Sequence, residues 1–182
     1  MEETRFVGKG IVKKDAEALL SGRPVYTDDL APDSCLIIKL LRSPHAHAII
    51  EDIKTDAAKK VPGIAAIFTY KDVPQTRFTE AGQTFPEPSP DDRLILDQRV
   101  RYVGDPVAIV VGKDEACVNR ALRIIKVKYQ VLKPILDFTK SLDNDIIIHP
   151  EDNYVAKEGR GTDPKRNLCA SQSRGEGDVD QV

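Results

Sequence analysis

The sequence lacks tryptophan altogether and contains one methionine and only three cysteines, Cys35, Cys117 and Cys169, among 182 residues. The cysteines are widely spaced and form no Cys-x-x-Cys pair, which argues against a disulfide framework and a zinc site. Long apolar runs are also missing: the best, 107–111, is far shorter than the roughly 18 to 20 residues that cross a bilayer. The acidic start, 1–5, is unlike a secretory signal. These absences predict a cytoplasmic protein with no membrane partner.

An excess of charge of one sign is missing too. Lys and Arg number 27 against 29 Asp and Glu, so the formal net charge is -2. This balance offers no basic surface for a phosphate backbone, and nucleic acid is not an expected partner. What remains is ordinary globular usage, with 41% hydrophobic and 31% charged residues. The length is enough for one folded, soluble domain with a sizeable core.

Apolar periodicity predicts short helices and short strands along the chain. The clearest helix begins after Asp114, an acceptable N-cap, and its apolar face extends to Ile125. From there the apolar residues alternate, which predicts a half-buried strand over 125–129. The other expected elements are helices over 15–20 and 56–60 and strands over 36–41, 48–53, 64–69, 99–103 and 107–111.

Three segments are expected to lack regular structure. Residues 72–93 contain four prolines, and their apolar residues follow neither the period of 2 of a strand nor the period of 3.6 of a helix, which predicts a long surface loop. The Gly104-Asp105-Pro106 sequence predicts a hairpin or corner between two strands, with Gly104 in a backbone conformation that a side chain resists. Residues 150–182 are rich in glycine and charge and hold too little apolar surface for a core.

Two histidines form a candidate metal-binding pair. His45 and His47 are two residues apart, so on a strand both rings would lie on one face, as a metal ion could require. A third ligand is missing from the neighbourhood, and His149 or Asp52 could supply one only through tertiary folding. Structural hydrogen bonding is therefore the interpretation we favour for these histidines.

Other motifs that carry chemistry are incomplete or absent. Gly8-Lys9-Gly10 begins like a dinucleotide fingerprint, but Lys13 stands where the last glycine would be and no strand precedes it. There is no Gly-x-Ser-x-Gly elbow and no P-loop. The prediction is therefore that the chain holds no catalytic, cofactor-binding or metal-binding residue. From pattern alone, a ligand- or protein-binding module is favoured.

Several segments, taken in order, resemble the start of the molybdenum-binding large subunit of the xanthine dehydrogenase and aldehyde oxidase family. Each segment is short and weak alone, but together they cover about residues 5–138. They are 7–16 with 21–30, the Leu-Arg-Ser-Pro-His-Ala-His-Ala run at 41–48, 61–64 with 72–74, 100–108, and 125–129.

The resemblance implies a fold. It predicts the α/β hammerhead domain, an α+β fold with a mixed sheet and a few short helices, as a single domain over 1–150. Residues 151–182 would then be a linker toward molybdopterin-binding domains that are absent from this sequence, so the chain looks like a fragment.

The resemblance also implies a function. The family hydroxylates purines, aldehydes and N-heterocycles with a water-derived oxygen on molybdenum, and passes electrons through iron-sulfur clusters and usually FAD. Its molybdopterin contacts and catalytic glutamate lie downstream of the hammerhead domain and have no matching position here. The expected role is therefore structural, and the isolated fragment is predicted to be inactive.

Partners follow from the same resemblance. They would be the molybdopterin-binding domains of the same subunit and the iron-sulfur and flavin subunits or domains of an oxidoreductase of purine catabolism. The alternative is a free-standing hammerhead-like binding module without redox activity.

Overall fold

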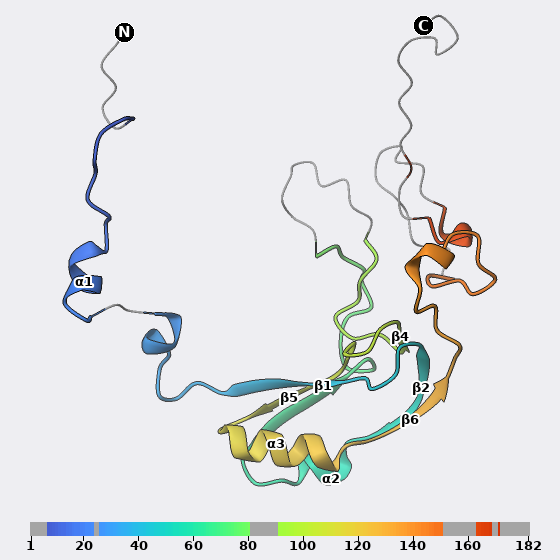
Figure 1. Ribbon diagram of the computed structural model, residues 1–182. Helices are drawn as coiled ribbons and strands as arrows, with labels where there is room; N and C mark the ends of the chain where they lie inside the picture. Colours follow the sequence, from blue (N-terminus) through green and yellow to red (C-terminus); the bar gives the residue numbers. More distant parts are fainter. Residues whose placement is uncertain (1–6, 24–25, 81–90, 151–162, 169–170, 172–182) are drawn as a thin grey trace, which may run out of the picture. The chain divides into compact units, whose positions relative to one another are not determined.

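The computed structural model describes residues 7–23, 26–80, 91–150, 163–168 and 171 (Figure 1). The chain divides into two units, Met1–Cys35 and Leu36–Val182. The first unit contains helix α1 (Ala16–Leu20), as the apolar spacing predicted, and a 3-10 helix over Thr27–Leu30. No residue of α1 is buried. The described part of this unit therefore has no core of its own.

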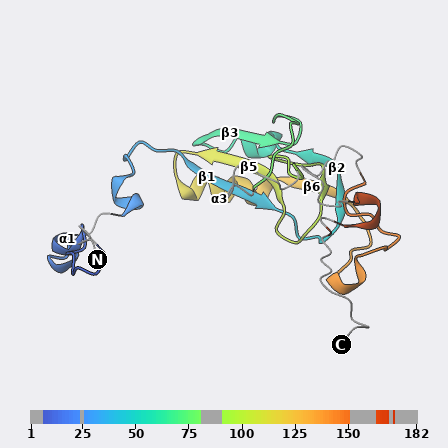
Figure 2. The same ribbon diagram turned by 90° about the horizontal axis from the view of Figure 1, so that it is seen from above.

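The second unit is built on two three-stranded antiparallel sheets. The first sheet has the order β1-β5-β3 and the second the order β4-β2-β6. Figure 2 shows β1, β5 and β3 side by side. The strands are β1 (Ile37–Arg42), β2 (Ala48–Lys54), β3 (Ile64–Thr69), β4 (Arg99–Val100), β5 (Pro106–Gly112) and β6 (Lys126–Val131). The helices are α2 (Asp56–Lys59) and α3 (Glu115–Ile124), with 3-10 turns over Phe138–Lys140 and Pro164–Arg166.

Helix α3 begins where the sequence predicts it. The Asp114 carboxylate accepts a hydrogen bond from the Cys117 backbone N–H at 2.8 Å, which satisfies one of the free donors of the first turn. Val118 and Ala121 are fully buried on the inner face of the helix. A Cβ at Gly112 would lie only 2.7 Å from the Cys117 sulfur, so a residue without a side chain lets β5 and α3 approach closely.

The core lies between the two helices and the strands of both sheets. It is filled by aliphatic side chains, whose burial removes apolar surface from water. The fully buried members are Ala48, Ile50, Ala58, Val100, Val107, Ala108, Val110, Val118 and Ala121. Helices α2 and α3 lie on the same side of the first sheet (Figure 1). One face of that sheet is thus covered.

The α+β class and the short helices and strands are confirmed. In place of one mixed sheet, the described residues form two antiparallel sheets. The strands on either side of α3 do not share a sheet: β5 pairs with β1 in the first sheet, and β6 pairs with β2 in the second. The turn at Gly104 is a corner between them, and Gly104 has φ +97°, which confirms its predicted conformation. β4 is shorter than expected, with two residues.

Two predicted segments lie partly outside the described residues. In the loop predicted over 72–93, residues 81–90 are not described, and Phe78 and Arg93 close its base by an antiparallel bridge. In the predicted linker, 163–168 is described, and the Asn167 amide donates to the Ser141 and Ile146 carbonyls at 2.9 and 2.8 Å. The division into a domain over 1–150 and a linker over 151–182 stays a prediction. Within the described ranges, no helix is long and apolar enough to span a membrane.

Candidate functional site

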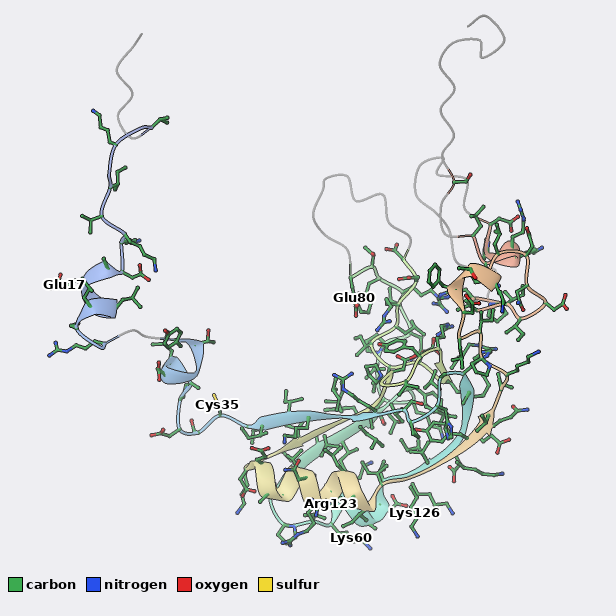
Figure 3. The ribbon with its side chains drawn as sticks, viewed as in Figure 1. Glu17, Cys35, Lys60, Glu80, Arg123 and Lys126 are labelled. Atoms are coloured by element: carbon green, nitrogen blue, oxygen red, sulfur yellow. The ribbon has the colours of Figure 1, made fainter. Side chains whose placement is uncertain are left out.

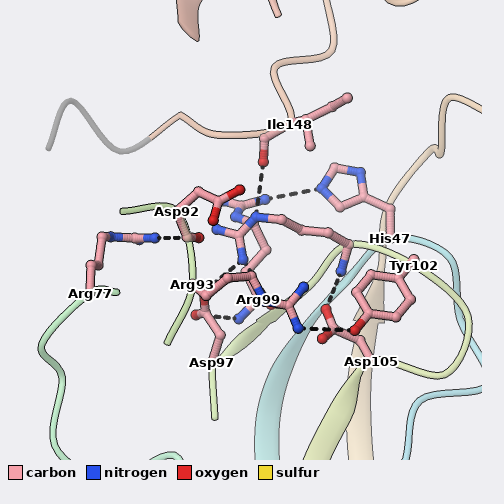
Figure 4. Close-up of polar contacts among 10 residues, drawn as sticks. His47, Arg77, Asp92, Arg93, Asp97, Arg99, Tyr102, Asp105 and Ile148 are labelled. Atoms are coloured by element: carbon pink, nitrogen blue, oxygen red, sulfur yellow. Dashed lines mark hydrogen bonds and ion pairs between the residues drawn. The ribbon is translucent and has the colours of Figure 1, made fainter. Parts of the chain in front are cut away.

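A polar cluster lies at the end of the second sheet, where β4 runs into the corner at Gly104 (Figure 4). It is built around Arg101, the residue directly after β4. The other side chains that form it are His47, Arg93, Asp97, Arg99, Tyr102 and Asp105. We refer to these seven residues as the polar cluster.

Arg101 holds the polar cluster together. Its guanidinium pairs with the Asp97 carboxylate at 2.6 Å and donates to the Ile148 carbonyl at 3.2 Å. The Arg101 side chain is only 12% exposed and the Asp97 side chain 21%. Because water screens such a pair weakly, the attraction is stronger than that of a surface ion pair. Arg101 therefore joins β4 to the segment around Ile148, which follows the 3-10 turn over Phe138–Lys140.

Asp105 completes the corner. Its carboxylate accepts a hydrogen bond from the Arg101 backbone N–H at 2.8 Å, and the residue is buried. Burial raises the pKa of Asp105, while the bond from Arg101 and the charges of Arg93 and Arg101 act in the opposite direction. The net direction is upward, so desolvation outweighs the favourable contacts.

His47 connects three parts of the chain. Its Nδ1 lies 3.0 Å from the Lys133 carbonyl, and its Nε2 lies 3.2 Å from a guanidinium nitrogen of Arg99. A carbonyl only accepts and a guanidinium only donates, so Nδ1 must carry the proton and Nε2 must accept. Both contacts therefore require a neutral imidazole. Both ring nitrogens are engaged, as structural hydrogen bonding predicts.

His45 faces a different neighbour. Its ring lies edge-on to the Tyr129 ring with centroids 4.9 Å apart. Asp52, considered as a further ligand, lines a separate hollow with Lys54 and Lys126. Across the described part of the chain, no group of three or more His, Cys, Asp or Glu side chains could hold a metal ion. The histidine pair is thus not assembled into a ligand set there.

Two cavities flank the polar cluster. The first, of about 250 Å³, has a lining of mixed polarity that includes Arg93, Arg101, Asp105 and His149. The second, of about 260 Å³, is more apolar and is lined on one side by 135–136, 146 and 148. The Arg93 guanidinium lies over the Tyr102 ring, 5.5 Å from its centroid, and donates to the Tyr102 hydroxyl at 3.1 Å. Both cavities are smaller than the 300–1,000 Å³ of typical ligand pockets.

The polar cluster has the chemistry of a structural brace. Its Arg101 guanidinium is paired with Asp97 and donates to the Ile148 carbonyl, and its Arg93 donates to the Tyr102 hydroxyl. Its Arg99 donates to His47, which is held in one tautomer. The described contacts include no nucleophile activated by an adjacent base. Cys35 is exposed (Figure 3), whereas the buried Cys117 thiol lies 3.1 Å from the Asp114 carbonyl, and Cys169 lies outside the described residues.

Sequence reasoning missed the polar cluster. Its arginines and aspartates are scattered over 93–105 in a stretch expected to be strand and turn. The alternation of Arg99 and Arg101 was the available signal, but it does not reveal that Arg101 reaches the carbonyl of Ile148, which lies 47 residues further along the chain.

Comparison with known proteins gives a consistent result. Residues 21–133 match the family described as aldehyde oxidase and xanthine dehydrogenase, a/b hammerhead domain. The probable hypoxanthine oxidase XdhD of Escherichia coli K12 is 32% identical over 99% of this chain and 21% of its own length. The putative xanthine dehydrogenase molybdenum-binding subunit XdhA of the same organism is 36% identical over 83% of this chain and 21% of its own.

Solved structures show the same likeness. The aldehyde oxidoreductase from Desulfovibrio gigas superposes with a TM-score of 0.64 and is 31% identical, over 79% of this chain and 16% of that one. The chain therefore spans about a fifth of the length of the curated relatives that it matches.

Proposed function

Because the chain belongs to the aldehyde oxidase and xanthine dehydrogenase family, as a hammerhead domain, we propose that it is the structural N-terminal part of a molybdenum hydroxylase large subunit. The enzyme would be xanthine dehydrogenase-like. It would oxidise purines, related N-heterocycles or aldehydes with an oxygen derived from water. The observation that carries the proposal is the 32% identity to a probable hypoxanthine oxidase along 99% of this chain.

The geometry of the polar cluster supports a structural role in that enzyme. Arg101 bonds to the Asp97 carboxylate through its guanidinium and to the Asp105 carboxylate through its backbone N–H, so these contacts stabilise the corner between the two sheets. Groups that are already paired must lose those contacts before they can bind a substrate. We therefore assign them to the architecture of the domain and expect the chemistry elsewhere in the subunit.

The family implies molybdenum held by molybdopterin, and the described residues do not fit this group. The first cavity carries three carboxylates beside only two guanidiniums, and its Arg101 is already paired with Asp97. It therefore offers no excess of positive charge for the phosphate of the pterin. We propose that the cofactor, the iron-sulfur clusters and FAD are held by other parts of the complete enzyme.

Purification of the chain from its own cells tests the proposal. An affinity tag is added to the chromosomal gene, and the native mass and the molybdenum and pterin content of the product are measured. We expect a particle much larger than the 20.2 kDa of these residues, with about one molybdenum per tagged chain. A 20.2 kDa particle without molybdenum would instead favour a free-standing binding module.

A further inference from the structure

The first sheet has one face that the helices do not cover. Lys39 on β1 contacts Glu115 and Asn119 of α3, so the residues beside it in the strand, Ile38 and Leu40, point away from the helices. The strand register carries this side across β5 and β3, since Ile38 pairs with Val111 and Phe68 pairs with Ile109. We call this surface the open face. Its residues are Ile38, Leu40, Ala66, Phe68, Ile109 and Val111.

The open face is apolar throughout. Ile38 is 63% exposed and Phe68 39% exposed, and the other four residues are half-buried. None of the six carries a charge or a hydrogen-bonding side chain. Single exposed apolar residues are ordinary in folded proteins. The open face differs in that six apolar residues adjoin one another across three neighbouring strands.

We propose that the open face is the surface through which this domain docks onto the remainder of its own large subunit. The inference rests on the proposed function. About four fifths of each curated relative lies outside the match, so in such a protein these strands lie beside a much longer stretch of polypeptide. The absence of charge fits an apolar protein surface and does not fit nucleic acid or an anionic lipid headgroup.

The size of the open face favours a partner in the same subunit over a second copy of the chain. Three strands about 4.8 Å apart, with two side-chain repeats of about 7 Å along each, cover roughly 200 Å². A stable complex between separate molecules buries about 800 Å² on each partner. A surface this small binds firmly only when its partner is tethered nearby, because the tether lowers the entropic cost of association.

Cysteine labelling tests the proposal. In a background with Cys35→Ser and Cys169→Ser, Ile38→Cys reports on the open face. Val131→Cys is the matched control, since Val131 is 60% exposed and lies on β6 of the other sheet. Maleimide labelling rates are measured on the 182-residue chain alone and on the tagged particle from native cells. A Phe68→Asp variant of the tagged chain is purified in parallel.

We expect both cysteines to react at similar rates in the chain alone. In the molybdenum-containing particle, Ile38→Cys should react at least tenfold more slowly, while Val131→Cys keeps its rate. Phe68→Asp should reduce recovery of the particle at least tenfold, while the circular dichroism spectrum of the chain alone remains that of a folded domain.

The contrary outcomes separate the two proposals. A molybdenum-containing particle in which Ile38→Cys still labels rapidly, or in which both cysteines slow equally, would overturn the docking surface and leave the proposed function standing. If the chain alone forms a dimer that protects Ile38→Cys, the occupant is a second copy and the proposal is wrong. If no molybdenum-containing particle is found, the proposed function fails and this inference fails with it.

Discussion

The two sheets of the second unit differ in whether the side chains at their surfaces have partners within the chain. At the end of the second sheet, the Asp97 carboxylate accepts from the Arg101 guanidinium and the Asp105 carboxylate accepts from the Arg101 backbone N–H. On the first sheet, the open face leaves six apolar side chains without cover from α2 or α3. A paired polar group gains little from a new partner, whereas an exposed apolar group gains from burial. The comparison therefore assigns stability to the polar cluster and recognition to the open face.

The largest expected effect contrasts a buried and an exposed isoleucine. Ile50 on β2 is fully buried, so Ile50→Ala should lower the free energy of unfolding by about 3 kcal/mol through lost burial and a cavity. Ile38→Ala on the open face removes a side chain that is 63% exposed and should cost less than about 1 kcal/mol in the isolated chain. Urea denaturation of both variants measures the difference. Equal losses would mean that the open face is packed within the chain.

The second prediction concerns ion pairs. Asp97→Ala leaves the Arg101 guanidinium without its carboxylate in a poorly hydrated site and should cost about 2 kcal/mol. The control is Glu51→Ala, which removes the 2.8 Å pair with Lys128, whose side chain is 75% exposed, and should leave the denaturation midpoint nearly unchanged. Chemical denaturation near neutral pH gives both values. If Asp97→Ala lowers the free energy of unfolding as little as Glu51→Ala does, the polar cluster contributes little to stability.

The third prediction concerns the corner between the sheets. Gly104 has φ +97°, a conformation that side chains resist, although an added Cβ would meet no atom within 4 Å. Gly104→Val should therefore cost more than about 1 kcal/mol through backbone strain alone. Gly10→Val serves as the control, because Gly10 has no positive φ and no close neighbour. A denaturation midpoint for Gly104→Val that matches the parent would contradict this reading of the turn.

Much of the fold could be predicted from local patterns. Helix α3 follows from Asp114 and the apolar spacing behind it, and β6 follows from the alternation that begins at Ile125. The division into two antiparallel sheets could not be predicted, because strand pairing joins residues far apart, such as Ile37 and Gly112. Periodicity reports only which side of an element is buried.

The polar cluster was out of reach for a related reason. The contact between Arg101 and the Ile148 carbonyl depends on how the chain returns after β6, which no local pattern encodes. His47 was singled out as a candidate residue, but its partners, Arg99 and the Lys133 carbonyl, are 52 and 86 residues away. The family motifs identified the domain because they match a known family. Such a match does not require predicting which distant residues come into contact.

The smallest expected effect is a pH dependence that separates two aspartates. Burial raises the pKa of Asp105, so its contribution to the free energy of unfolding is fully present below its ordinary value near 3.8 and is lost as pH rises through the higher folded value. Asparagine keeps an oxygen that can accept from the Arg101 N–H but does not titrate. The parent should therefore gain stability relative to Asp105→Asn as pH falls from about 7 to 4.

Asp72 gives the opposite expectation and serves as the control. The Thr69 hydroxyl, and then its backbone N–H, donate to the Asp72 carboxylate and lower its pKa, so its contribution is present above its ordinary value and lost as pH falls. The parent should therefore lose stability relative to Asp72→Asn as pH falls below about 4, and the two should differ by a constant amount between about pH 7 and 5. Urea midpoints of the three proteins at several pH values measure both differences. Parallel curves for Asp105→Asn and the parent would show that the bond from Arg101 and the charges of Arg93 and Arg101 offset the burial of Asp105, and that the corner carries no net electrostatic cost.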